Sequence, residues 1–299
     1  MLYSLEMNKS ADTLVLCGSS LNGIVLLGSL QYLEDNEYLN CLEKYVGTSS
    51  GALICYFLSI GYKPTEIMVN ICIRNIIEKI QTLDMGGVFR GTGGISFMVI
   101  QEEIERATIS KIGYLPTMGD IKNKFNKELY IKTYNITKNR DEYLSWETTP
   151  ELPCITALRM SCNIPFIFEN FKYGESFYID GGITGSFPIE MGVKLSDNII
   201  GFYISTQSRD DIQIPEMGIL DYFYKLINLP LKQISNVHIK NCKKEGVEIF
   251  NIKPFSNVKL FSLKMDPKYK LDMFIDGYCQ MEKLNIQNSL QKEKTDDDE

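Results

Sequence analysis

Apolar residues in the first part of the chain alternate between short runs and longer stretches at helical spacing. The run at 13–17 ends in glycine and predicts a buried strand, and residues 24–33 repeat apolar positions as a helix does. Residues 45–46 predict a second, short strand, and residues 50–60 predict a second helix. This strand-helix-strand-helix order is typical of a parallel sheet with helices on both faces. We therefore expect a three-layer α/β/α fold with a mostly parallel central sheet.

The remaining pattern predicts a single domain. It indicates strands at 129–134, 142–146, 177–180, 198–205 and 247–252, helices at 64–80, 153–162, 216–228, 230–241 and 268–286, a turn at 139–141 and a glycine-rich loop at 84–95. No internal repeat or clear linker interrupts it. We expect an N-terminal extension at 1–11, one domain at 12–290 and a charged, disordered tail at 291–299.

Composition and charge narrow the class of protein. The formal net charge of -7 argues against a nucleic-acid partner. Eight cysteines without a CxxC pair, together with a single histidine, favour free thiols and argue against a zinc site. Residues 1–11 lack the pattern of a signal peptide, and no apolar run approaches the about 20 residues of a membrane span. We expect a soluble, cytoplasmic protein without a metal or cofactor.

The charge is unevenly distributed along the chain. Residues 225–270 hold ten lysines against three acidic residues. Basic residues near an anionic lipid surface contribute about 1 kcal/mol each, so this segment could lie on a membrane. The alternative is an ordinary solvated face.

The segment Gly47-Thr48-Ser49-Ser50-Gly51 lies between the second predicted strand and its helix. Glycines on both sides of a serine permit the sharp strand-to-helix turn that exposes a nucleophilic serine. The N-terminus of the following helix then points at the charge that develops beside the serine. The alternative is a turn in which a serine caps the helix. The five residues alone leave both interpretations open.

A serine nucleophile needs a base. The single histidine, His238, follows Ser49 in the chain as a hydrolase triad requires, but its lysine-rich, helical surroundings favour a surface position. Asp180 is the other candidate. It ends an apolar strand, and Gly181 and Gly182 permit a tight turn beside its carboxylate. An ordinary Asp-Gly turn would explain the same residues.

Three segments carry a more specific signal because they occur in a fixed order. They are LVLCGSSLNGIVLLGSLQYLED at 14–35, GTSSGAL at 47–53, and ALRMSCNIPFIF at 157–168 followed by YIDGGITGSFPI at 178–189. Together they resemble the oxyanion loop, the nucleophile elbow and the Asp-Gly-Gly motif of the patatin-like phospholipase family. A GGVFRGTGG loop and a hairpin at 128–147 occupy comparable places. The resemblance covers residues 12–206.

The resemblance implies a Ser–Asp dyad, with Ser49 as nucleophile and Asp180 as base. It implies hydrolysis of acyl esters of phospholipids or other lipids, through an acyl-enzyme and without a metal. It also implies oxyanion donors at the N–H groups of Gly18, Ser19 and Ser50. The motif glycines that support these residues are Gly23, Gly47, Gly51, Gly181 and Gly182.

The loop Gly18-Ser19-Ser20-Leu21-Asn22-Gly23 departs from the family's Gly-Gly-Gly-x-Arg/Lys-Gly. Serine keeps the N–H group but is strained where φ is positive, and Asn22 replaces a fixed positive charge. The resemblance implies a hydrolase of the phospholipase A or lysophospholipase type. The altered loop adds two alternatives to this expectation. One is a catalytically weak or inactive lipid- or protein-binding member. The other is an acyltransferase or thioesterase that uses the same serine.

Overall fold

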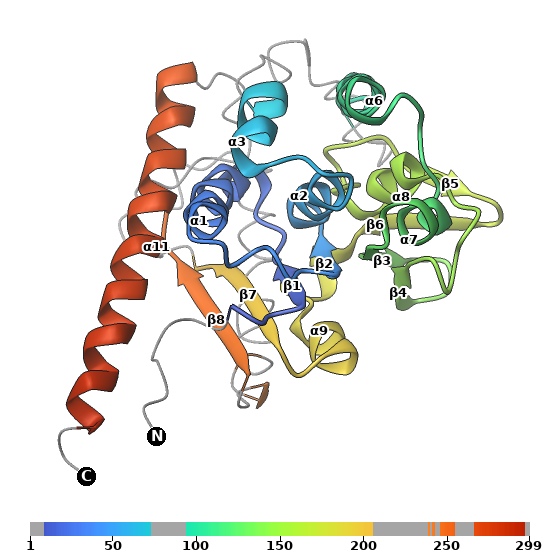
Figure 1. Cartoon of the computed structure of the whole chain (residues 1–299). Coiled ribbons are helices and arrows are strands. Elements are labelled where there is room, and N and C mark those ends of the chain that lie inside the picture. Colours follow the sequence, from blue (N-terminus) through green and yellow to red (C-terminus); the bar gives the residue numbers. More distant parts are fainter. Residues whose placement is uncertain are drawn as a thin grey trace, which may run out of the picture.

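The described part of the chain is built around one mixed sheet of eight strands (Figure 1). This computed structural model describes residues 9–72, 94–205, 239, 241–242, 246–254 and 266–296. The strands are β1 (Thr13–Leu16), β2 (Lys44–Thr48), β3 (Glu128–Asn135), β4 (Arg140–Leu144), β5 (Phe171–Tyr173), β6 (Ser176–Asp180), β7 (Ile199–Ile204) and β8 (Val247–Ile252). Their spatial order is β5-β6-β3-β2-β1-β7-β8, and β4 also pairs with β3.

Helices cover both faces of this sheet. They are α1 (Gly23–Asp35), α2 (Ser50–Ser59), α3 (Pro64–Ile67), α6 (Met98–Ile112), α7 (Met118–Phe125), α8 (Cys154–Ser161), α9 (Ile189–Leu195) and α11 (Pro267–Asp296), with short turns η1 (Ser20–Asn22), η2 (Met68–Cys72) and η3 (Gly181–Thr184). In Figure 1, α1 and α2 lie on one side of the sheet and α9 on the other. The three-layer α/β/α fold expected from the sequence is confirmed.

The middle of the sheet is parallel, as the strand-helix-strand pattern predicts. Strands β3, β2, β1, β7 and β8 pair in parallel, each with the next. All four residues of β1 are buried, as is typical of a parallel strand with helices on both faces. The carboxyl ends of these strands therefore meet at one edge of the sheet, and Ser49 follows β2 at that edge.

Two strands end head to head along one edge of β3. In the parallel ladder, Thr48 at the end of β2 pairs with Lys132. In the antiparallel ladder, Asp180 at the end of β6 pairs with Thr133, the next residue of β3. The ends of β2 and β6 therefore meet although the two strands are far apart in the sequence.

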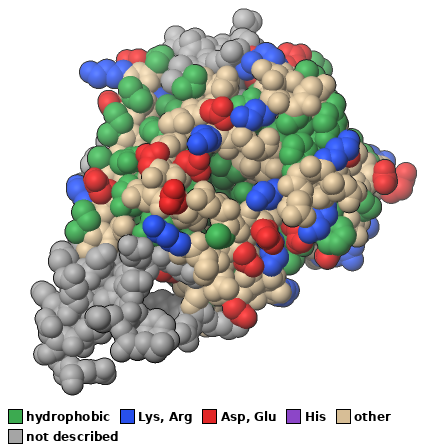
Figure 2. Space-filling model, viewed as in Figure 1, with side chains coloured by type: hydrophobic (Ala, Val, Ile, Leu, Met, Phe, Trp, Pro, Cys, Tyr) green, Lys and Arg blue, Asp and Glu red, His purple; other side chains and the backbone are tan. Residues whose placement is uncertain are grey.

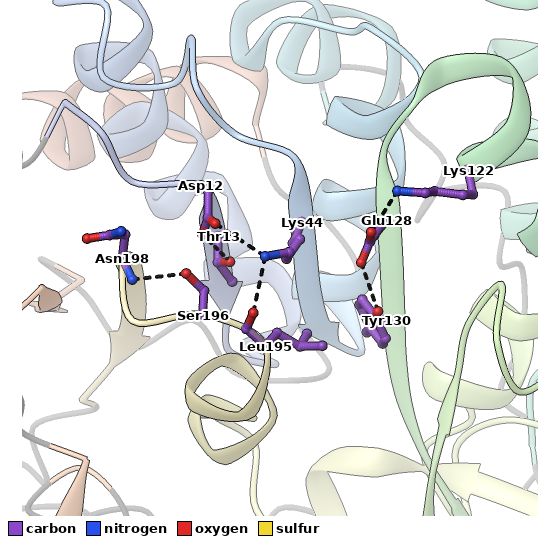
Figure 3. Close-up of polar contacts among 9 residues, drawn as sticks. All are labelled: Asp12, Thr13, Lys44, Lys122, Glu128, Tyr130, Leu195, Ser196 and Asn198. Atoms are coloured by element: carbon purple, nitrogen blue, oxygen red, sulfur yellow. Dashed lines mark hydrogen bonds and ion pairs between the residues drawn. The ribbon is translucent and has the colours of Figure 1, made fainter.

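The opposite end of the sheet is held by polar contacts (Figure 3). The Lys44 ammonium group donates to the Leu195 carbonyl at 3.1 Å and pairs with Asp12 at 3.2 Å. Glu128 accepts from Lys122 at 2.7 Å and from the Tyr130 hydroxyl at 2.9 Å. These contacts fix where the strands begin.

The C-terminal helix α11 packs along α1 at close range. A Cβ atom on Gly277 would lie 1.9 Å from the Val25 carbonyl oxygen, and the Ser29 hydroxyl donates to the Gly277 carbonyl at 3.0 Å. The sequence predicts disorder for the tail at 291–299, but α11 continues to Asp296. Extending an existing helix needs no new nucleus, so a polar segment can continue it.

Several elements differ from the sequence prediction. Helices α6, α7 and α9 and strand β5 are not predicted, and β4 begins at Arg140 and ends at Leu144, two residues before the predicted positions. The buried face of α6 includes Glu103 and Thr108, which weakens its apolar periodicity. The helix predicted at 64–80 is described only as α3 and η2. The predictions at 84–95, 216–228 and 230–241 lie largely outside the described residues.

Candidate active site

Ser49 is the residue between β2 and α2, and its backbone is strained. Its φ of 53° and ψ of -124° lie where residues other than glycine are rarely found. Although Ser49 occupies the N-cap position of α2, its side chain makes no capping hydrogen bond. The interpretation of this serine as an ordinary helix cap is therefore wrong. The side chain is left to other contacts.

The two glycines of the elbow are required by close approach of the backbone. A Cβ atom on Gly47 would lie 2.6 Å from the backbone of Ala52, and one on Gly51 would lie 2.5 Å from the Cys17 carbonyl oxygen. Real Cβ atoms do not come so near to backbone atoms. The spacing Gly-x-Ser-x-Gly thus reflects the packing of α2 onto β1 and β2.

Asp180 faces Ser49 from the end of β6. The Gly182 N–H donates to its Oδ1 at 2.7 Å, and hydrogen bonding with the Ser49 side chain also lowers the pKa of its carboxyl. Both residues are buried, Ser49 with 8% and Asp180 with 7% of their surface exposed. Burial raises the pKa of Asp180 to about 6, although both hydrogen bonds and the charge of Lys132 lower it. The carboxylate is thus more basic than an ordinary aspartate.

Ser161, at the end of α8, holds the elbow in place. The Ser49 N–H donates to the Ser161 hydroxyl at 2.8 Å, and that hydroxyl donates to the Lys132 carbonyl at 2.7 Å. Ser161 therefore links the elbow to β3. Ser161 lies within the motif at 157–168, but nothing in the sequence places it beside Ser49.

The two oxyanion donors expected from the loop before α1 both have acceptors within the protein. The Gly18 N–H donates to the Ser186 carbonyl at 2.8 Å, and the Ser19 N–H donates to the Ser50 hydroxyl at 3.0 Å. In this conformation both expected donors are already occupied, which the sequence could not indicate because the acceptors come from other elements. Ser20 has a φ of 52°, so it takes the positive-φ position of the loop.

The N–H groups of Ser20 and Ser50 remain as donors. Each begins a helical turn, where the backbone N–H has no partner within the turn itself. Neither N–H group donates a hydrogen bond to another of the described residues. These two groups come from the loop and from the elbow, on both sides of Ser49 in the chain.

The other predicted glycines, Gly23, Gly181 and Gly182, lie where helical turns begin. Gly23 begins α1, and Gly181 and Gly182 form the turn η3 directly after Asp180. Cys162 is half-buried: burial and the charge of Asp180 raise the pKa of its thiol, and hydrogen bonding with the Ser49 side chain acts against this shift. His238 lies outside the described residues.

Two features are absent from the described residues. Within these segments, no group of three or more His, Cys, Asp or Glu side chains is placed to hold a metal ion. None of the helices in the described parts of the chain combines the length and the apolar character that crossing a bilayer requires.

Comparison with known proteins agrees with this geometry. The chain is 33% identical over 199 residues to "Probable lipid hydrolase 463L" of Invertebrate iridescent virus 6, covering 64% of this chain and 67% of the relative. It is 28% identical to "Uncharacterized protein R571" of Acanthamoeba polyphaga mimivirus, covering 71% of this chain and 73% of that one. The solved structure of VipD from Legionella pneumophila has the same fold, with a TM-score of 0.57 at 16% identity, over 93% of this chain and 67% of VipD.

The sequence profile described as Patatin-like phospholipase matches residues 14–193, which is more than half of the chain. The matched range begins within β1 and ends within α9, so it includes the loop, the elbow and the Asp-Gly-Gly turn. The chain therefore belongs to the patatin-like phospholipase family.

Proposed function

We propose that this protein is a lipid acyl hydrolase in which Ser49 is the nucleophile and Asp180 the general base. The observation that carries the proposal is the meeting of the strained Ser49 and the buried Asp180 at the ends of β2 and β6, which pair with consecutive residues of β3. Membership of the patatin-like phospholipase family supports it, as does the similarity to a viral protein named a probable lipid hydrolase. We assign the activity to the phospholipase A or lysophospholipase type.

The proposed reaction proceeds in two steps. Asp180 accepts the hydroxyl proton of Ser49 as the oxygen attacks the acyl carbonyl, and it returns the proton to the leaving alcohol. Water then attacks the acyl-serine and gives a proton to Asp180, which returns this proton to the Ser49 oxygen as the fatty acid is released. The N–H groups of Ser20 and Ser50 stabilise the oxyanion in both steps. No step requires a metal ion.

A second candidate is a lipid- or protein-binding member of the family with little or no activity. The observation that favours it is the state of the loop, since the N–H groups of Gly18 and Ser19 already have acceptors. Loss of one oxyanion donor typically costs about 3–4 kcal/mol of transition-state stabilisation. The acyltransferase or thioesterase alternative uses the same acyl-serine with a different acceptor or ester.

The test is hydrolysis of a short-chain p-nitrophenyl ester and a fluorogenic phospholipid, with EDTA present. We compare the wild type with Ser49→Ala, Asp180→Asn and His238→Ala. We expect the first two variants to lose activity and His238→Ala to keep it. Labelling of the wild type by a serine-directed fluorophosphonate, absent in Ser49→Ala, identifies the nucleophile. A wild type that neither hydrolyses nor labels contradicts the proposal and favours the binding protein.

We also propose that the lysine-rich segment at 225–270 contacts anionic membranes. Most of it lies outside the described residues, and Lys270 is buried with 3% exposure, so that lysine is excluded from the contact. On the face seen in Figure 2, basic and acidic side chains of the described residues are intermixed and form no single basic patch. Flotation with neutral and anionic vesicles tests it, and equal binding to both contradicts it.

A further inference from the structure

Lys132 is a buried lysine near the middle of β3, with 4% of its surface exposed. It lies between the two ladders of the site, since it pairs with Thr48 and its neighbour Thr133 pairs with Asp180. Burying an ammonium group is costly unless it is paired and hydrogen-bonded. The partners of Lys132 therefore indicate which part of the site its charge stabilises.

The Lys132 side chain contacts the segment that follows Asp180. Its ammonium group donates to the Gly185 carbonyl at 3.0 Å and pairs with Asp141 of β4 at 3.6 Å. The Asp141 carboxylate also accepts from the Thr184 hydroxyl. Two adjacent residues of the turn after Asp180 are thus held: Gly185 by Lys132, and Thr184 by Asp141.

The charged groups around the site come from four elements. Asp180 faces two groups: the Lys132 ammonium group, which comes from β3, and the thiol of Cys162, the residue after α8. Lys132 in turn faces Asp141 from β4 and Glu190 from α9. Burial lowers the pKa of Lys132, and Asp141, Glu190 and Asp180 act against that shift. Lys132 is the positive charge that acts on the Asp180 carboxylate.

We propose that Lys132 is the positioning residue of the base: its buried ammonium group holds the turn after Asp180 through the Gly185 carbonyl and places a positive charge next to the strand end that carries Asp180. This inference rests on the proposed function, in which Asp180 is the general base. Removing the charge leaves Asp180 buried without a counter-charge, so it retains its proton to higher pH. The proton on Asp180 prevents it from accepting the Ser49 proton.

The test is the pH dependence of kcat/KM for phospholipid hydrolysis by the wild type, Lys132→Met, Lys132→Arg and Lys44→Met. Lys44 is the matched control, because it also lies in a parallel strand, donates to one carbonyl (Leu195) and pairs with one aspartate (Asp12), but at the other end of the sheet. We expect Lys132→Met to move the acid limb of the pH profile about one pH unit upward. Lys132→Arg keeps the positive charge, so its acid limb should stay close to that of the wild type. Lys44→Met should leave the acid limb unchanged.

Asp141→Asn is the complementary variant, with 40% of the Asp141 side chain exposed, so we expect it to fold. It removes a negative charge beside Lys132 and retains an acceptor for Thr184, and we expect the acid limb to move downward. The proposal is overturned by an acid limb that Lys132→Met leaves unchanged. If Lys132→Met does not fold, an unchanged or raised limb in Asp141→Asn overturns it.

A readout without substrate separates this inference from the proposed function. The titration of Asp180 is also measured by the pH dependence of the difference in unfolding free energy between each protein and its Asp180→Asn derivative. An inactive wild type contradicts the proposed function, yet this difference still shows whether Lys132→Met raises the pH at which Asp180 titrates. A titration that does not move contradicts the role of Lys132 even if the enzyme is active.

Discussion

Ser49 and Asp180 meet because β2 and β6 end head to head on the same edge of β3. The pairing partners of Thr48 and Asp180 are consecutive residues of β3, Lys132 and Thr133. A change in the register of either strand would separate the hydroxyl from the carboxylate. The geometry of the proposed dyad is therefore set by backbone pairing.

The first prediction concerns the pH dependence of activity. The pKa of Asp180 is raised to about 6 by burial, and only the ionised carboxylate accepts the Ser49 proton. We expect kcat/KM to fall about tenfold for each pH unit below this value and to level off above it. Steady-state hydrolysis of the fluorogenic phospholipid between pH 4 and 9 measures the limb. A profile that is flat through this range contradicts Asp180 as the base.

The second prediction concerns stability. Because the pKa of Asp180 is higher in the folded state, the folded protein binds the proton more tightly, and stability is lost as pH rises from the unfolded value of 3.8 to about 6. At pH 8 we expect Asp180→Asn to stabilise the protein by about 3 kcal/mol, from about 1.36 kcal/mol per pKa unit. At pH 4 or below the gain disappears. Urea denaturation at both pH values measures it.

Asp12 provides the control for this prediction, because hydrogen bonds and Lys44 lower its pKa despite partial burial. Its contribution to stability is present above its unfolded pKa and is lost as pH falls through the lower, folded pKa. Asp12→Asn should therefore destabilise the protein at pH 8, opposite in sign to Asp180→Asn. The same sign for both variants would contradict the assignment.

A third prediction concerns Ser161. Ser161→Ala leaves the buried Ser49 N–H without its acceptor, so we expect a loss of about 1–3 kcal/mol in unfolding free energy together with a lower kcat. The control is Ser59→Ala, since Ser59 is also buried and donates to a carbonyl of α2, but does not touch the elbow. It should lose stability with kcat unchanged. Equal kcat values for the two variants would exclude a role for Ser161 in the elbow.

The fourth prediction concerns Ser50. Its hydroxyl accepts from the Ser19 N–H at 3.0 Å, which is one of the family's expected oxyanion donors. Ser50→Ala frees that donor, so we expect kcat to rise by about tenfold or more, in line with the large effect of single oxyanion donors. Ser19→Ala removes only the contact between the two hydroxyls and should change kcat little. A fall in kcat for Ser50→Ala would show instead that the hydroxyl holds the loop for catalysis.

The fifth prediction tests the packing of the elbow. Gly51→Ala places a Cβ atom 2.5 Å from the Cys17 carbonyl oxygen, and we expect a destabilisation of at least about 1–3 kcal/mol from overpacking. In Gly23→Ala the nearest contact is 3.5 Å, to the Ser50 side chain, and the residue has helical φ, so this variant should fold normally. Thermal unfolding of both variants measures the difference. Similar midpoints would contradict the close approach of α2 to β1.

The sequence by itself determined the strands that carry Lys132 and Asp180 and the strand and helix on either side of Ser49, because hydrophobic periodicity and glycine spacing are local properties. It singled out Ser49 between Gly47 and Gly51, and Asp180 before Gly181, as candidates, because a sharp turn needs small residues beside it, and an ordinary turn remained the alternative for each. It also predicted a strand that contains Lys132, but an isolated lysine in an apolar strand does not say what it faces.

Only the tertiary structure decided which of these residues touch one another. The pairing of β2 and β6 with consecutive residues of β3 brings Ser49 to Asp180 and places Lys132 behind the turn. The occupation of the Gly18 and Ser19 N–H groups by Ser186 and Ser50 was equally hidden, since each acceptor comes from another element. Hydrogen bonds and charges between distant segments depend on strand register and helix packing, and a single sequence carries no direct record of either.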